Sequence, residues 1–555
     1  MKSVKKKGTL VDSYSNFDNL KKIILGKNDI QIFTFDYESH KKLNEEKIPH
    51  LISDNFVSDD EYKKIQNYVY RFSYWYSDKE LQEFLNYAGI NIGRLYLDEL
   101  VNFFVRFLKK FKEIELIFKK HPNMEFHAEN ELFQIVHFFT DSAIDLSQKK
   151  KFSQDYTHDL IKINFKFGYF KKDIFLKRNS YLRLKRVFDY LTNIILTSKT
   201  DPNKTKILFS EYNTERFKKL FLDSKKFNSQ IFFFGRRRPS FWNFETLKTI
   251  YNSNCKIITK NSLGNDIVEE NSKKGIDLMH NRLKNIWSNN KLLNKLFTFE
   301  RYEIFELIRP TLYELIEEKL SHTIYEIELT KTMFQKFKFD HTVIINESGF
   351  SEQIIASLSK TNGINCIHMQ EGFHWDSEGA SENLISQGVF IHDAAKLQVW
   401  GEIDMILSKN IGNVPLDKIQ VIGAPRYDEL FTSIKKKSNY ILLASSADPQ
   451  PEEVEGLRIK KIQKYLDDIL ETSKIISELG EKLVIKLHPS KTQLVDISKL
   501  APKINPKISV SSYGEISSLL PSAKLLISVG LSSAMIEAMI LKIPVIFIPG
   551  IDYNW

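Results

Sequence analysis

The amino-acid sequence predicts an α/β protein built from two Rossmann-like domains. From residue 341 to residue 550, short apolar runs of strand length alternate with helical patterns, which is typical of parallel strands joined by crossover helices. The chain has 555 residues, which is too many for one hydrophobic core. The basic stretch from Lys435 to Ser438 has the composition of a linker. We therefore expect an N-terminal domain over 1–430 and a C-terminal domain over 431–555.

The C-terminal domain has the clearest pattern of strands and helices. Four apolar runs are expected as strands, at 440–444, 483–489, 523–529 and 544–549. A helix is expected at 534–541, before the last strand. The chain stops at Trp555, soon after a strand, where more helices would be expected. We therefore expect either a truncated chain or a minimal domain.

Small and basic residues stand at the ends of these strands. Lys486 and His488 lie two residues apart, and therefore on one face, where both could meet one phosphate. Gly530, Ser532 and Ser533 follow the next strand and open a helix. Parallel sheets bind ligands where strands end and helices begin, and the start of a helix favours an anion. A nucleotide diphosphate is therefore the expected ligand, with simple helix capping by the serines as the alternative.

In the N-terminal domain, a β-α-β opening precedes a long helical pattern. Strands are expected at 29–35 and 49–53, around a helix at 37–46. Apolar residues then recur at threes and fours over about 58–200, which we interpret as a helical insertion between strands of one sheet. A second helical stretch covers about 276–336. Seven further strands are expected, at 206–209, 230–234, 255–259, 341–345, 365–369, 397–401 and 419–423.

Three arginines follow one of these strands directly. Arg236, Arg237 and Arg238 come after the strand at 230–234, and that end of a parallel sheet faces the ligand. The forked guanidinium group suits phosphate or carboxylate oxygens. The sequence therefore indicates a contact with an acceptor or a phosphate, and an exposed basic turn is the alternative.

The overall composition indicates a globular protein of a reducing compartment. The chain holds only two cysteines, Cys255 and Cys366, which lie far apart. Its start is basic but lacks an apolar signal core. The most apolar stretch, 525–550, contains charged residues and a proline, which argues against a membrane span. We therefore expect a cytoplasmic protein.

The formal net charge of +10 is unevenly distributed. Residues 151–200 hold eleven Lys and Arg against four Asp and Glu, with aromatic residues among them. This segment could contact anionic lipid headgroups or a phosphorylated acceptor at the inner face of a membrane. Single-stranded nucleic acid and a merely solvated helical face are the alternatives, of which we favour nucleic acid least.

A series of short motifs resembles the GT-B fold of nucleotide-sugar enzymes over roughly the last 215 residues. The similarity is closest to the CDP-glycerol glycerophosphotransferases and to capsule and surface-polysaccharide glycosyltransferases. The motifs are Gln370-Glu371-Gly372, Trp400-Gly401, Val421 to Asp428, Lys486 to Pro489, Ser532-Ser533, Glu537-Ala538 and Lys542 to Ile546. The stretch His368 to His374 is also similar to the H-V-E-A-G-L-R motif of UDP-N-acetylglucosamine 2-epimerases. Here the Glu is displaced by one position and the Arg is absent.

The resemblance implies two Rossmann-like domains that face a cleft. It implies a metal-independent transferase that moves a sugar or polyol phosphate from a nucleotide donor to a surface-glycan or lipid-linked acceptor. An epimerase-like enzyme and a degenerate binding module are the alternatives. No D-x-D element indicates a metal, and no cofactor beyond the donor is expected.

The same resemblance gives individual residues their expected roles. Donor binding is expected of Ser445, Ser446, Lys486, His488, Gly530, Ser532, Ser533 and Glu537, with Glu537 on the ribose. Four residues compete as general base, namely Glu347, His368, Glu371 and His374. Glu371 is preferred because it takes the place of the catalytic His in the Gln-x-Gly element, and His488 is the second catalytic candidate. His368 and His374 are also candidates for acceptor contact, whereas Arg426 and Asp428 are expected to form a structural pair.

Overall fold

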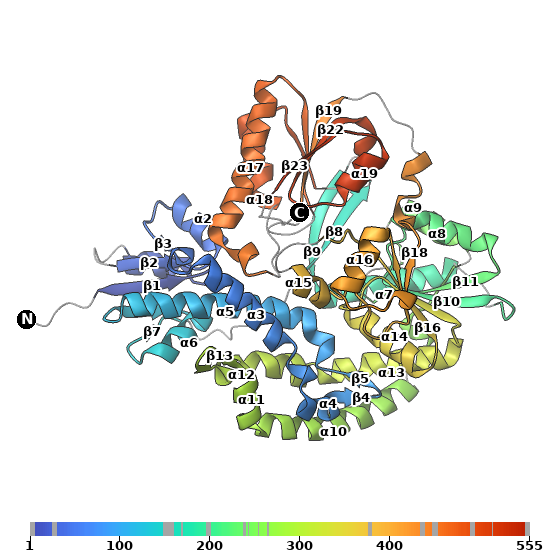
Figure 1. The fold of residues 1–555 in the computed structure, drawn as a ribbon, viewed down its shortest axis with the longest axis horizontal. Coiled ribbons are helices and arrows are strands. Elements are labelled where there is room, and N and C mark those ends of the chain that lie inside the picture. Colours follow the sequence, from blue (N-terminus) through green and yellow to red (C-terminus); the bar gives the residue numbers. More distant parts are fainter. Residues whose placement is uncertain are drawn as a thin grey trace, which may run out of the picture. The chain divides into compact units, whose positions relative to one another are not determined.

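The structure is a computed structural model of the chain (Figure 1). It describes residues 6–24, 30–147, 160–167, 170–195, 201–236, 240–241, 243–253, 255–263, 266–375, 380–432, 439–446, 453–488, 494–512 and 514–549. The chain forms two compact units, and each is described by itself. Unit one comprises Met1–Phe72, Val101–Asp155 and Ile434–Tyr553, and unit two comprises Ser73–Leu100, Tyr156–Ser433 and Asn554–Trp555. The expected linker, Lys435 to Ser438, lies outside the described residues.

Unit one contains two separate parallel sheets, of which the N-terminal one has the order β3-β2-β1-β6-β7. Its strands are β1 (Lys7–Val11), β2 (Ile30–Thr34), β3 (Leu51–Ile52), β6 (Glu125–Ala128) and β7 (Ile144–Asp145). The helices along this part of the chain are α1 (Phe17–Ile24), α2 (Tyr37–Glu45), α3 (Asp59–Ser73), α5 (Leu97–Lys120) and α6 (Asn130–Phe139). The opening strands therefore form a sheet of their own. The prediction of one sheet shared with the strands after residue 205 is therefore wrong, because the sequence pattern did not indicate the short strands β1 and β6.

The C-terminal sheet of unit one has the order β21-β20-β19-β22-β23, and all its strands are parallel. Its strands are β19 (Tyr440–Ser445), β20 (Leu483–Lys486), β21 (Ser509–Ser511), β22 (Ala523–Val529) and β23 (Val545–Ile548). Its helices are α17 (Ile459–Glu478), α18 (Leu494–Ile504) and α19 (Ala534–Ile540). Apolar side chains of β19, β20 and β22 pack with those of α17 into one core, and Figure 1 shows α17 beside this sheet. The strand order reverses between β19 and β22, as in doubly wound sheets.

Polar contacts connect the two sheets of unit one. The Arg458 guanidinium pairs with Asp59 of α3 at 2.8 Å and lies 4.4 Å from the centre of the Tyr62 ring. The backbone N–H of Val454 donates to the side-chain oxygen of Gln66 at 2.8 Å. Lys41 of α2 pairs with Asp496 of α18. Segments from opposite ends of the chain therefore meet within one compact unit.

Unit two is built on a seven-stranded parallel sheet with the order β12-β11-β10-β15-β16-β17-β18. The strands are β10 (Thr205–Ser210), β11 (Ser229–Phe234), β12 (Cys255–Ile257), β15 (His341–Ile344), β16 (Asn365–Met369), β17 (Lys396–Val399) and β18 (Ile419–Val421). All seven coincide with strands expected from the sequence. This sheet is also doubly wound, with its reversal between β10 and β15. The two sheets expected from the sequence thus confirm the α/β, GT-B fold class.

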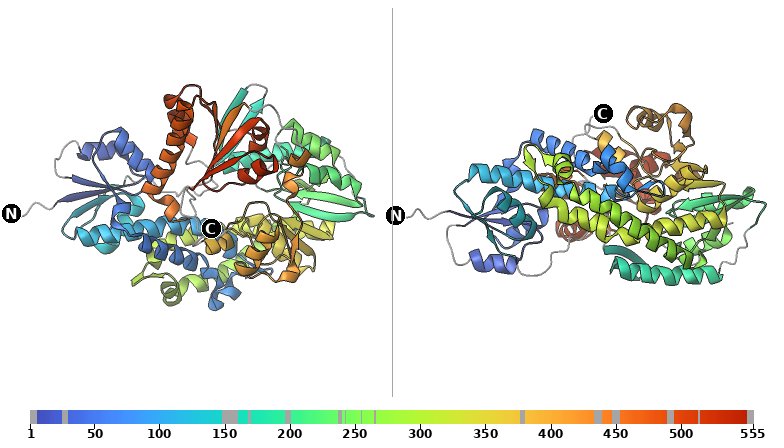
Figure 2. Two further views of the ribbon diagram at one scale, coloured as in Figure 1. Left: turned by 45° about the horizontal axis from the view of Figure 1, so that its top comes forward. Right: turned by 90° about the horizontal axis from the view of Figure 1, so that it is seen from below.

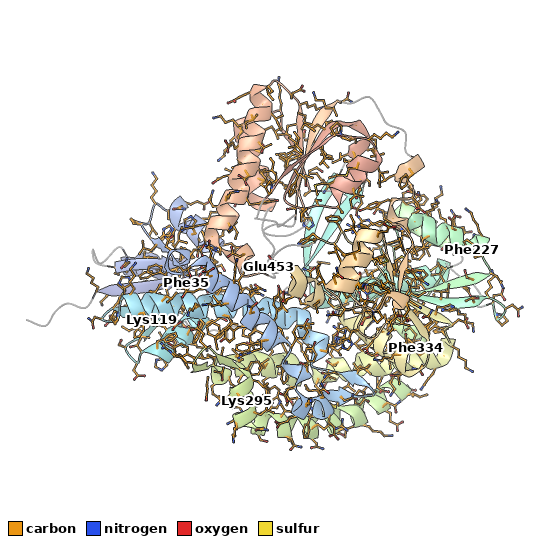
Figure 3. The ribbon with its side chains drawn as sticks, viewed as in Figure 1. Phe35, Lys119, Phe227, Lys295, Phe334 and Glu453 are labelled. Carbon is orange, nitrogen blue, oxygen red and sulfur yellow. The ribbon has the colours of Figure 1, made fainter. Side chains whose placement is uncertain are left out.

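Helices surround this sheet, and aromatic residues fill its core. The helices are α4 (Lys79–Leu85), α8 (Lys218–Asp223), α9 (Phe244–Asn252), α10 (Asp266–Ser288), α11 (Asn290–Leu296), α12 (Phe305–Tyr313), α13 (Leu320–Phe337), α14 (Phe350–Thr361), α15 (Ala380–Ser386) and α16 (Glu402–Asn410). Figure 2 shows α10 and α13 running side by side. Phe334 of α13 is buried against Phe339, whose ring contacts Phe232 of β11, whereas Phe227 is 67% exposed (Figure 3). Four short strands form two small hairpins, β4 (Asn86–Tyr87) with β5 (Ile90–Asn91) and β13 (Thr298–Phe299) with β14 (Tyr302–Glu303).

An antiparallel hairpin, followed by a helix, stands near the end of the segment that was expected to be helical throughout. Strands β8 (Leu160–Phe167) and β9 (Phe170–Lys177) pair antiparallel, and α7 (Arg178–Ile195) follows them. The sequence alternates apolar residues at Ile161, Ile163, Phe165 and Phe167, which is a strand period. The expectation of a helical segment over about 58–200 is therefore wrong here. It holds for α3, α5, α6 and α7.

Among the described residues, no helix combines the length and the apolar character that a membrane span needs.

Candidate functional site

The expected donor-binding residues meet at the carboxyl ends of neighbouring strands in the C-terminal sheet. Ala444 of β19 pairs with Lys486 of β20, and Ser445 pairs with Val529 of β22. The loops after these three neighbouring strands therefore begin side by side, on both sides of the point where the strand order reverses. This is the place at which doubly wound sheets bind ligands.

Hydrogen bonds fix the strand ends at this edge. The Ser445 hydroxyl accepts the backbone N–H of His488 at 2.7 Å, and the N–H of Ser446 donates to the carbonyl of Val529 at 3.1 Å. The Lys486 ammonium, which is only 7% exposed, donates to the carbonyl of Leu487 at 3.1 Å. Ser445 therefore positions the loop of His488, a role that the sequence did not reveal.

The loop between β22 and α19 requires a glycine at its start. Gly530 has a φ of +79°, a left-handed conformation that side chains disfavour. The Ser528 hydroxyl donates to the Gly530 carbonyl at 2.8 Å, and the Ser532 hydroxyl accepts the N–H of Ala534 at 3.3 Å. Ser533 is the partly exposed N-cap residue of α19, and its side chain makes no capping bond. Glu537 is buried in the first turn of that helix.

The N-terminal sheet has the same strand order, but acidic side chains stand at the carboxyl ends of its strands. The Asp36 carboxylate accepts the N–H of Ser13 at 2.7 Å, and Glu129 accepts the N–H of Asn16 at 2.9 Å. Lys110 bridges Asp12 and Glu131 at 2.8 and 2.9 Å. The loop N–H groups that would bind a phosphate are thus bonded to carboxylates of the protein. The C-terminal sheet is the better candidate for an anionic ligand.

In unit two, the Gln370 amide connects the ends of two neighbouring strands. Its nitrogen donates to the carbonyl of Gly372 at 2.9 Å and to the Asp404 carboxylate at 2.8 Å. Its oxygen accepts the N–H of Trp400 at 2.8 Å, and the Trp400 indole donates to the Gln370 carbonyl at 3.0 Å. The Gln-x-Gly and Trp-Gly motifs are therefore one hydrogen-bonded structure, and this structure sets the position of Glu371.

Glu371 follows β16 and is held by two arginines. Its side chain, 21% exposed, lies 3.4 Å from the Arg216 guanidinium, and its carbonyl accepts a hydrogen bond from Arg426 at 2.7 Å. Asp428 lies 3.3 Å from Lys219. The expected Arg426–Asp428 pair is therefore corrected, because each residue has another partner. Arg216 was missed, since a single arginine after β10 carries no signal in the sequence.

The three other candidates for general base are buried. His368 is 1% exposed, and its Nε2 lies 3.1 Å from the Ile345 carbonyl. Burial lowers the pKa of His368, and it lowers the pKa of His374 to about 3. Glu347 accepts the backbone N–H groups of residues 392 to 394 at 2.9–3.1 Å. Among the four candidates, Glu371 is thus the one most accessible to an acceptor.

The expected phosphate contact at Arg236 is corrected by the structure. Its guanidinium donates to the Glu326 carboxylate of α13, with one bond of 2.8 Å, and its backbone N–H donates to Glu211. A buried carboxylate beside it accounts for the charge of Arg236 without a ligand. Arg237 and Arg238 lie outside the described residues.

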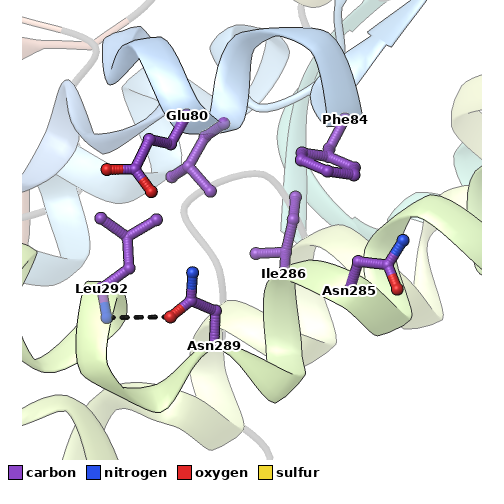
Figure 4. A pocket seen from close by; sticks show the side chains of 7 residues that line it. Glu80, Phe84, Asn285, Ile286, Asn289 and Leu292 are labelled. Carbon is purple, nitrogen blue, oxygen red and sulfur yellow. Dashed lines mark hydrogen bonds between the residues drawn. The ribbon is translucent and has the colours of Figure 1, made fainter.

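Unit two also contains a cluster of possible metal ligands, which includes Glu347, and a separate pocket. Glu347, His392 and Asp393 form a group within ligating distance of a single ion, but Arg94 already pairs with both carboxylates at 3.4 and 3.1 Å. A pocket of about 290 Å³ lies between α4 and the α10–α11 region (Figure 4). Its lining includes Glu80, Phe84, Asn285 and Asn289, and none of the expected site residues lines it.

Comparison with known proteins finds resemblance only among solved structures. No family profile and no curated protein matches the chain. A UDP-N-acetylglucosamine 2-epimerase from Rickettsia bellii is 12% identical, with 62% of this chain and 78% of that chain covered and a TM-score of 0.35. A glycosyltransferase of kitacinnamycin is 11% identical, with 64% and 82% covered and a TM-score of 0.34. A variant of the wall teichoic acid polymerase TagF is 14% identical, with 67% and 76% covered and a TM-score of 0.31.

Proposed function

We propose that the chain is a GT-B transferase that moves a sugar or a polyol phosphate from a nucleotide-activated donor to a glycan or lipid-linked acceptor. The observation that carries the proposal is the meeting of Ser445, Lys486 and Gly530 at the point of strand reversal in the C-terminal sheet. At that end of the sheet, the partly exposed His488, Ser532 and Ser533 stand beside the buried Lys486, in contrast to the acidic side chains at the equivalent end of the N-terminal sheet.

In the proposed reaction, the acceptor hydroxyl forms the new bond and loses its proton to Glu371. The bond between the transferred group and the nucleotide phosphate breaks, and the departing phosphate takes the electron pair. The Arg216 guanidinium, 3.4 Å from the Glu371 carboxylate, holds this side chain in position. In unit one, His488 and the loop from Gly530 to Ser533 are the groups proposed to bind the phosphates of the donor. The proposed chemistry uses no cofactor beyond its two substrates, the nucleotide-activated donor and the acceptor.

Donor binding is tested by ligand-induced thermal stabilisation, because a ligand that binds only the folded state raises the melting temperature. Uridine, guanosine and cytidine diphosphates and their sugar or glycerol conjugates would be compared at millimolar concentration. We expect at least one to raise the melting temperature of the wild type and to have a smaller effect on the Ser532→Ala/Ser533→Ala double variant.

The matched control is Ser509→Ala, because Ser509 is an exposed serine on the edge strand β21 of the same sheet. It should respond to the nucleotide as the wild type does. If no nucleotide stabilises the protein, or if the double variant responds like the control, the proposed donor site is wrong. Independently of these melts, mass spectrometry of nucleotide that copurifies with the chain would identify the donor class directly.

A further inference from the structure

One helix of unit two has an exposed apolar stripe beside exposed arginines. Leu184, Val187 and Leu191 of α7 are spaced as i, i+3 and i+7, which places them on one face. They are 41%, 55% and 44% exposed, and Tyr190 next to them is 59% exposed. Large apolar side chains that are contiguous and exposed mark a surface that meets a partner.

The opposite face of α7 is packed against the rest of unit two. Tyr181 is 5% exposed and Lys185 is 6% exposed. The ring of Phe188 contacts that of Phe241 edge-to-face at 5.8 Å. The helix also contacts β12, the edge strand of the seven-stranded sheet. The exposed stripe is therefore the outer surface of a docked helix.

The charge around the stripe indicates the kind of partner. Arg183 and Arg186 are exposed, and neither has an ion-pair partner among the described residues. The helix carries four basic residues and one acidic residue, and the hairpin before it, 160–177, carries five and one. Basic residues beside an apolar stripe are the composition of helices that lie in the interface of an anionic membrane. Tyr190 suits the same interface, because its ring is apolar and its hydroxyl is polar.

A second exposed helix provides the contrast. Ile403 and Ile406 of α16 are 74% and 52% exposed, but the exposed charged residues of this helix, Glu402 and Lys409, have opposite signs. An anionic lipid surface would therefore attract α7 more strongly than α16, although both expose aliphatic side chains. Charge therefore distinguishes the two surfaces.

We infer that the exposed face of α7, defined by Arg183, Leu184, Arg186, Val187, Tyr190 and Leu191, binds the surface of an anionic lipid bilayer. The apolar stripe enters the headgroup region, and the arginines contact lipid phosphates. This inference is independent of the proposed transferase activity, because binding can be measured without turnover.

The test is flotation of the full chain with vesicles of phosphatidylcholine plus phosphatidylglycerol, compared with vesicles of phosphatidylcholine alone. We expect recovery only with the anionic vesicles, and loss of recovery at high salt, where the Debye length shrinks to roughly 3 Å. Each basic residue near the surface contributes about fivefold to partitioning, so Arg183→Ser/Arg186→Ser should reduce it by about 25-fold. Val187→Ser/Leu191→Ser should also reduce it. All four positions are exposed, and a thermal melt of each variant confirms that it folds.

Ile403→Ser/Ile406→Ser is the matched control, and it should float like the wild type. Equal recovery with both kinds of vesicle, or an equal loss in the control, would overturn the inference. So would a wild type that ignores vesicles but binds a single-stranded oligonucleotide, since the arginines would then serve nucleic acid. A change of oligomeric state in Val187→Ser/Leu191→Ser without vesicles, measured by light scattering, would instead identify the stripe as a contact between copies of the chain.

Discussion

Replacement of His374 by Gln should remove a large part of the acid sensitivity of unit two. His374 is 6% exposed, and burial lowers its pKa from 6.5 to about 3. Between these two values the unfolded chain binds a proton that the folded chain does not, so stability rises with pH and falls on acidification. At about pH 5, the difference from 6.5 is about 1.5 units, or about 2 kcal/mol at 1.36 kcal/mol per unit. This figure depends only on a folded-state pKa well below 5.

Urea unfolding followed by circular dichroism, at about pH 7.5 and about pH 5, measures the effect. The wild type should lose about 2 kcal/mol more than His374→Gln on acidification, because Gln cannot take up a proton. His368, whose proximity also contributes to the lowered pKa of His374, remains in both proteins. His137→Gln is the control, since His137 is exposed. If wild type and His374→Gln lose the same stability, the pKa of His374 in the folded protein is not lowered by its burial.

Two further substitutions test the interpretation of the seven-stranded sheet. Glu371→Gln should lower kcat by about 10²–10⁴-fold in a steady-state assay and leave nucleotide-induced stabilisation unchanged in a thermal melt. Turnover near that of the wild type would exclude Glu371 as the base. Arg236→Gln should cost about 1–3 kcal/mol of stability because it leaves the Glu326 carboxylate without its bidentate partner. A loss of acceptor or phosphate affinity at unchanged stability would instead support the ligand contact that the sequence predicted for Arg236.

The sequence predicted all seven strands of the sheet of unit two and four of the five strands of the C-terminal sheet, but not β21, because the signal of these predicted strands is local. The run from Ala523 to Val529 is apolar and flanked by breakers, and it forms β22 with the expected bounds. The edge that carries Lys486, Gly530 and Ser445 follows from strand order alone. The expected site residues were therefore brought together where a parallel sheet places them.

Contacts between distant segments could not be predicted in this way. Arg216 lies beside Glu371 although 155 positions separate them, and nothing near Arg216 indicates this. The same holds for Arg236, whose partner Glu326 lies 90 positions away. The hairpin of β8 and β9 was missed for another reason. Its strand-like alternation stands next to long amphipathic helices, whose period dominated the interpretation.

The contacts of Arg458 and Val454 with α3 have a consequence for the order in which the chain can fold. The bond from Val454 to Gln66 spans 388 positions. At roughly 5–20 residues per second, a ribosome needs about 20–80 s to synthesise that length. Throughout this interval the surface of α3 around Asp59, Tyr62 and Gln66 lacks the segment that covers it in the finished protein. Unit two, whose sheet strands are contiguous from 205 to 421, is complete in the meantime, so unit one is the last part of the molecule to acquire its native surface.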